Sequence, residues 1–72
     1  MVEMNQKYRV KPVFSVTQKG KPRAMVGRVV YVHPEGRYAV LEFEGPKGKA
    51  RESFWPENLT DRNRLLEKRR GA

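Results

Sequence analysis

One group of carboxylates in this chain has a spacing that could support catalysis or metal binding. Glu42 and Glu44 stand two residues apart, which places both on one face of an extended strand, and Glu52 follows nearby. Paired carboxylates can act as general acid and base. The chain has no cysteine, a single histidine, and no nucleophile or phosphate-loop motif to accompany them. We therefore predict no enzyme activity, no cofactor and no metal, and we expect these acids to pair with Lys49 and Arg51 across strands.

Positive charge is the stronger signal. The 72 residues include 16 Lys and Arg against 8 Asp and Glu, a net charge of +8. The excess lies at both ends of the chain, with net +6 over residues 1–33, −1 over 34–59 and +3 over 60–72. A field of this sign favours polyanions, with nucleic acid ahead of an anionic membrane. A chain this short has little room for a deep pocket, so we predict no small-molecule substrate. Leu65 and Leu66 alone give the basic tail little area for insertion, so we predict no membrane partner.

Alternating apolar and polar residues predict the strands that would position these side chains. The alternation is typical of half-buried β-strands, and glycine and proline mark the links between them. Pro12 cannot donate to a ladder, so the first strand should be bulged, broken or at an edge. Gly27 should mark a bulge, a bend or a close backbone approach. We expect strands over residues 8–16, 24–33, 37–44 and 49–55, a 3₁₀ turn over 56–59, and a short basic helix or tail over 60–70.

The faces of the third strand follow from the same alternation. Ala39, Leu41 and Phe43 should point into the core, as should Phe54 on the next strand. Tyr38 and Val40 would then form an outer apolar strip beside Tyr31 or Val30 of the preceding strand. Leu59 should close the core at one end. The chain should form a flexible lead-in (1–7), one barrel (8–59) and a basic helix or tail (60–72).

Two segments resemble known families. Phe54-Trp55-Pro56-Glu57-Asn58-Leu59 is similar to the closing segment of SH3 domains, and Gly27-Arg28-Val29-Val30-Tyr31-Val32 resembles the glycine-started strand of KOW-type barrels. The resemblance implies an SH3-like small barrel of four to five antiparallel strands, with RNA or polymerase partners on the KOW side. The peptide groove of SH3 domains needs an aromatic-rich acidic motif near the start of the domain and an acidic first loop. Here Tyr8 is followed by Arg9 and the corresponding loop is basic, so peptide binding is not implied. The run from Val29 to Phe54 also resembles small uncharacterised bacterial and prophage proteins.

Nucleic-acid binding is the function that we expect from these features. Aromatic side chains beside a basic groove can stack on unpaired bases while basic residues contact phosphates. The alternative is a protein-interaction or homodimerisation module that uses the exposed aromatic strip. The sequence has no apolar run of signal-peptide or membrane-span length, so we expect a cytoplasmic protein. The predicted nucleic-acid-binding residues are Lys19, Lys21, Arg28, Tyr31, Arg37, Tyr38, Lys49, Arg51, Trp55, Arg69 and Arg70.

Overall fold

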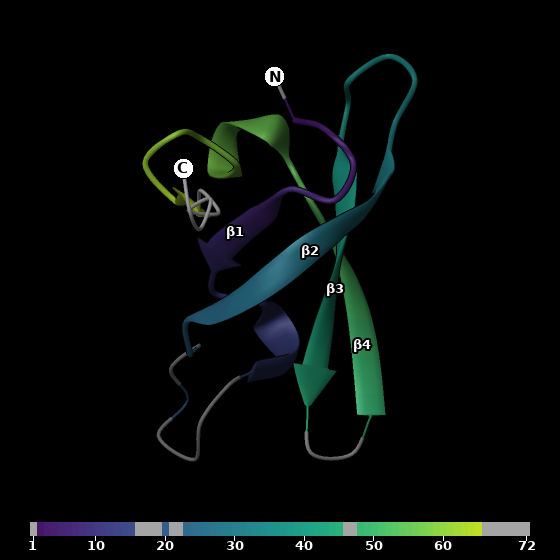
Figure 1. Cartoon of the computed structure of the whole chain (residues 1–72). Coiled ribbons are helices and arrows are strands. Elements are labelled where there is room, and N and C mark those ends of the chain that lie inside the picture. The colour runs from purple at the N-terminus through teal and green to yellow at the C-terminus, as the bar shows by residue number, and fades with distance from the viewer. Residues whose placement is uncertain (1, 16–19, 21–22, 46–47, 66–72) are drawn as a thin grey trace, which may run out of the picture.

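The computed structural model describes residues 2–15, 20, 23–45 and 48–65, and these form one antiparallel sheet (Figure 1). The five strands follow the order β4-β3-β2-β1-β5, so the first four form a meander and β5 returns beside β1. This confirms the mainly β, antiparallel prediction. The elements are β1 (Lys7–Val10), η1 (Val13–Ser15), β2 (Met25–Val32), β3 (Ala39–Gly45), β4 (Gly48–Phe54), η2 (Pro56–Asn58) and β5 (Arg64–Leu65), where η denotes a 3₁₀ turn.

The sheet is strongly bent because β2 exchanges partners along its length. Its second half pairs with β3, from Arg28 opposite Glu42 to Val32 opposite Ala39. Its first half pairs with β1, from Arg28 back to Met25. The register with β3 shifts between Val29 and Tyr31, which is the irregularity expected of a β-bulge and increases local twist. The ribbon of β2 therefore crosses in front of β3 at an angle (Figure 1).

The core lies on the concave side of this bent sheet. Ala39, Leu41 and Phe43 are buried there, as the alternation predicts, and the ring of Phe54 packs with its centroid 6.0 Å from that of Phe43. Leu59 is buried directly after η2, which confirms both the predicted 3₁₀ turn and the predicted closing residue. Tyr8, Val10 and Val29 complete the buried cluster.

Gly27 is required by close approach rather than by an unusual backbone angle. It lies in β2 opposite Tyr8, and a Cβ atom placed on it would lie 2.5 Å from a ring carbon of Phe43. The bulge of β2 lies further along, between Val29 and Tyr31. Of the three explanations that the sequence allowed for this glycine, close packing against the core is therefore the one observed.

The first predicted strand is shorter than expected. It ends at Val10, and after Pro12 the chain forms η1 instead of continuing to residue 16. The backbone N–H of Val13 donates to the Glu52 carboxylate at 3.0 Å, which fixes the turn against β4. Phe14 in this turn is 47% exposed, although its ring meets that of Phe43 edge-on with 5.3 Å between the centroids.

The predicted C-terminal helix is wrong for residues 60–65, which form a turn followed by β5. Asn63 explains the difference. Its side-chain carbonyl accepts from the Thr60 N–H at 2.8 Å, and its amide donates to the carbonyls of Asn58 and Arg9 at 2.8 and 3.1 Å. These bonds favour a turn over a helical start and hold the chain at the edge of β1, where Tyr8 pairs with Arg64. Residues 66–70 lie outside the described residues.

Closure into a barrel is not observed. Among the described strands, β4 pairs with β3 alone and β5 pairs with β1 alone, so the sheet is open at β4 and β5. The predicted barrel is therefore an open, bent sheet in this structure. No helix in the described part of the chain is long and apolar enough to cross a lipid bilayer.

Candidate nucleic-acid interface

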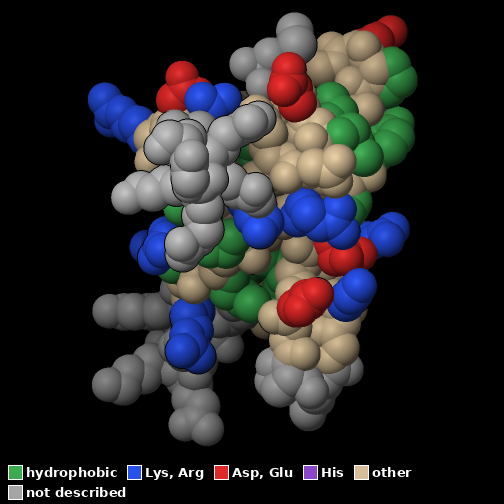
Figure 2. Space-filling model, viewed as in Figure 1, with side chains coloured by type: hydrophobic (Ala, Val, Ile, Leu, Met, Phe, Trp, Pro, Cys, Tyr) green, Lys and Arg blue, Asp and Glu red, His purple; other side chains and the backbone are tan. Residues whose placement is uncertain are grey.

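The strands present charged side chains on the face opposite the core, here called the outer face. Successive side chains of a strand alternate between faces, so the neighbours of buried residues point outward. Lys7, Arg28, Glu42 and Arg51 occupy one row across four strands, because each is paired with the next in the sheet register. In the view of Figure 2, basic and acidic side chains lie together across the middle of the molecule.

The adjacent row on the same face contains Arg9 of β1, Glu44 of β3 and Lys49 of β4.

Glu42 is the centre of an ion-pair network on this face. Its carboxylate accepts a hydrogen bond from Arg51 Nε at 3.0 Å and lies 3.6 Å from an Arg28 guanidinium nitrogen and 3.7 Å from Lys49 Nζ. The side chain is only 10% exposed. The hydrogen bond from Arg51 is the main cause that lowers the pKa of Glu42, with help from the three positive charges and against the opposing effect of burial. The expected cross-strand pairing with Lys49 and Arg51 is confirmed for Glu42.

The low pKa of Glu42 predicts part of the acid sensitivity of the fold. Because its pKa in the folded state lies below the unfolded value, Glu42 stabilises the fold above the unfolded pKa. That contribution disappears as the pH falls below about 4.3 and through the folded pKa. We expect Glu42→Gln to flatten the acid limb of unfolding free energy against pH, measured by urea denaturation. Glu57→Gln, at an exposed carboxylate of η2, is the control, and equal acid limbs in wild type and Glu42→Gln would contradict the prediction.

An aromatic strip borders the ion pairs on the outer face. Tyr31 lies opposite Val40, and its ring centroid is 6.0 Å from that of Tyr38. Val40 and Glu42 are two residues apart on β3, so the strip and the ion-pair row share one face. Tyr31 is 44% exposed. The predicted outer apolar strip is confirmed, and it lies beside basic residues as well as beside Glu42.

The three carboxylates singled out in the sequence do not form one cluster. Glu42 and Glu44 share the outer face, whereas Glu52 stands opposite the buried Leu41 and accepts the backbone N–H of Val13. Across residues 2–15, 20, 23–45 and 48–65, no group of three or more His, Cys, Asp and Glu side chains could hold a metal ion.

The predicted binding residues separate into three groups. Arg28, Lys49 and Arg51 meet around Glu42, with the pair Tyr31 and Tyr38 beside them. Two others lie away from this network: Arg37 pairs with Glu35 at 3.0 Å in the β2–β3 link, and Trp55 is 61% exposed where β4 leads into η2. Lys19, Lys21, Arg69 and Arg70 lie outside the described residues.

Sequence reasoning omitted Lys7 and Arg9, which β1 adds to the outer face. The alternation of Lys7-Tyr8-Arg9-Val10 already separates them from the buried Tyr8 and Val10. Their place beside Arg28 and Val26 depends on the register of β1 with β2. Alternation defines which face a side chain occupies but not its neighbour on the next strand, so this part of the site could not be located in advance.

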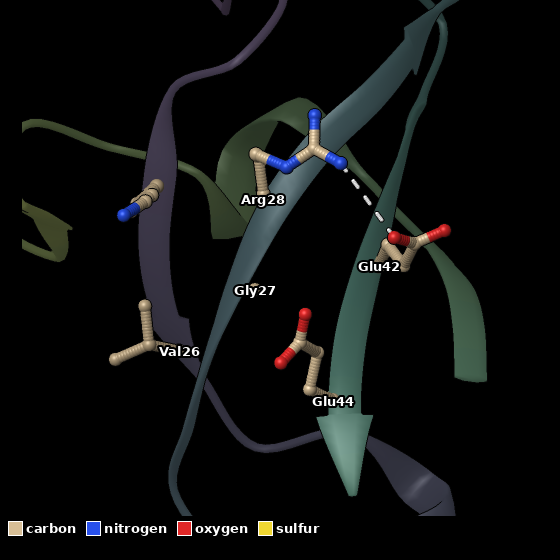
Figure 3. A pocket seen from close by; sticks show the side chains of 6 residues that line it. Val26, Gly27, Arg28, Glu42 and Glu44 are labelled. Atoms are coloured by element: carbon tan, nitrogen blue, oxygen red, sulfur yellow. Dashed lines mark ion pairs between the residues drawn. The ribbon is translucent and has the colours of Figure 1, made fainter. Parts of the chain in front are cut away.

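A hollow opens on the outer face where β2 and β3 diverge. Their pairing ends at Arg28 and Glu42, while β2 continues along β1 and β3 continues along β4. The resulting cavity has a volume of about 350 Å³. Figure 3 shows the Glu44 carboxylate extending from β3 toward β2 at Gly27. The lining residues are Lys7, Val26, Gly27, Arg28, Glu42 and Glu44.

Comparison with protein-family models, curated proteins and solved structures gave no match for this chain.

Proposed function

We propose that the protein is a non-catalytic module that binds single-stranded nucleic acid on the outer face of its sheet. The observation that carries this proposal is the combination of charge and exposed aromatic surface on one face. Five basic side chains stand there against two acidic ones, beside the exposed ring of Tyr31. The basic outer-face residues are Lys7, Arg9, Arg28, Lys49 and Arg51.

The two parts of this face have different roles in the proposal. The basic rows contact phosphates, which gives affinity that weakens as salt rises. Tyr31 and Tyr38 form a platform on which an unpaired base stacks, which is possible for any base because each has a π face. Glu42 holds Arg28 and Arg51 in place within their row, and its single negative charge leaves the network net positive.

We also propose that the strand arrangement is SH3-like, as an open sheet. A four-stranded meander, a 3₁₀ turn between β4 and β5, and the return of β5 beside β1 support this proposal. The block that resembles KOW-type barrels, Gly27–Val32, falls within β2, with Arg28 and Tyr31 on the outer face. A cytoplasmic location, where RNA and single-stranded DNA partners are present, belongs to the same proposal.

Fluorescence anisotropy of a labelled oligo(dT) tests the proposal directly. We expect saturable binding at about 50 mM salt that weakens steeply by about 200 mM, because phosphate contacts release counterions. Tyr31→Ala should weaken binding by about 5- to 150-fold, the loss of one stacked base, while Tyr31→Phe should retain most of the affinity because the ring remains. Absence of binding at low salt would overturn the proposal and favour the aromatic strip as a protein-docking surface.

A further inference from the structure

The negative charge of Glu44 is unexpected on a surface that binds only phosphates, because a carboxylate repels them. Its carboxylate forms no side-chain hydrogen bond or ion pair with any of the described residues, whereas Glu42, two positions away, binds three cations. An unpaired carboxylate beside a phosphate track lowers affinity for a polyanion. Because Glu44 is exposed and lines the hollow, its two carboxylate oxygens can accept hydrogen bonds from donors that a ligand brings to this position.

The opposite side of the hollow carries the complementary chemistry. Arg28 is held by Glu42 on one side and donates to the Asn5 side chain at 3.0 Å on the other, so its guanidinium has a defined position. Lys7 adds a second positive charge from β1. The exposed side chain of Val26 forms an apolar wall of the hollow, and the backbone of Gly27, which has no side chain, forms its floor. The hollow thus offers two acceptor oxygens on β3 and cationic donors on β1 and β2.

Guanine is the base whose edges match this arrangement. Its N1–H and its exocyclic amino group are adjacent donors, which fit the two oxygens of one carboxylate. Its O6 and N7 are acceptors, which arginine and lysine commonly contact. Adenine and cytosine each place an acceptor next to their amino group, and thymine places its single N–H between two carbonyls. Unpaired bases are read along these edges when they leave the stack of a single strand.

We infer that the hollow between β2 and β3 receives one guanine of the bound single strand, with Glu44 accepting from its N1–H and amino group. This inference rests on the proposed function and adds the base that the outer face selects. A volume of about 350 Å³ accommodates a single base together with water, and two residues of the basic row that would hold the flanking phosphates, Lys7 and Arg28, line the hollow.

The test compares oligo(dT) strands that carry one central guanine, hypoxanthine or adenine. We expect the guanine strand to bind roughly tenfold more tightly than the adenine strand, as one bidentate contact at a partly exposed site would give. Hypoxanthine, which lacks the amino group, should fall between them. Glu44→Gln should weaken binding of the guanine strand, because it removes one of the two oxygens that accept from guanine. It should strengthen binding of plain oligo(dT), because it removes one negative charge.

The opposite signs of these two effects separate base reading from simple electrostatics. Glu57→Gln removes the same charge from η2 and should leave the guanine preference unchanged. Equal affinity for all strands, or a guanine preference that survives Glu44→Gln, would overturn the inference and leave the proposed function standing. Absence of binding to every strand would overturn both.

Discussion

Replacement of Gly27 by alanine should destabilise the protein by about 2–3 kcal/mol, a large fraction of the stability of a domain this small. The added methyl would lie 2.5, 2.7 and 3.0 Å from three ring atoms of Phe43. That ring is buried, with Phe14 and Phe54 packed around it, so it has little room to move. The β2 backbone is held by its pairing with Tyr8 on the other side. Urea unfolding monitored by circular dichroism measures the loss.

Matched variants separate steric conflict from a general effect of changing glycine. Gly45→Ala places its methyl 3.5 Å from the nearest atom, an ordinary contact, and should alter the unfolding free energy little. Gly27→Ala should cost less stability in a Phe43→Leu background than in the wild type, because the smaller side chain vacates the space that the added methyl needs. If Gly27→Ala is as stable as Gly45→Ala, the packing of β2 on Phe43 is not as described.

Removal of Arg28 and Arg51 together should have the largest effect on binding. Both occupy the central row of the outer face and both hold the Glu42 carboxylate. Their replacement by alanine leaves Glu42 with Lys49 alone and removes two phosphate contacts. We expect oligo(dT) affinity to fall about tenfold or more at low salt, and the slope of log affinity against log salt to become shallower by about 1.4.

The control for this double variant removes the same charge elsewhere. Arg37 pairs with Glu35 in the β2–β3 link, and Arg62 is exposed in the turn before β5, so Arg37→Ala with Arg62→Ala leaves the outer face intact. Anisotropy titrations of both double variants at matched salt provide the comparison. Equal losses of affinity would mean that net charge, rather than the outer-face geometry, governs binding.

The parts of the fold that sequence predicted are those set by alternation within one strand. The inward set Ala39, Leu41 and Phe43 and the outward Tyr38 and Val40 follow from period-2 spacing, and the structure confirms them. Tyr31 joins the outer strip because the register of β2 shifts after Val29, and the sequence alone left Tyr31 and Val30 as alternatives. Sequence also marked the 3₁₀ turn before Leu59 because Pro56 fixes the backbone there.

The features that sequence did not predict depend on contacts between distant segments. The turn at Val13 is held by Glu52, 39 residues further along the chain. The short β5 forms because Asn63 bonds to Arg9 on β1. The hollow beside Glu44 exists because β2 pairs with β3 on one side of Arg28 and with β1 on the other. The alternation within a single strand does not determine the register of either pairing.

Amide chemical-shift mapping by NMR, with isotope-labelled protein and unlabelled oligo(dT), locates the surface that contacts the strand. We expect the arginine Nε–H signals of Arg28 and Arg51, and the backbone amide signals around Tyr31, to shift during the titration. Signals of η1 and of Arg62 should remain in place. Shifts that cluster at η1, or spectra that do not change at low salt, would contradict the claim that the outer face binds single-stranded nucleic acid.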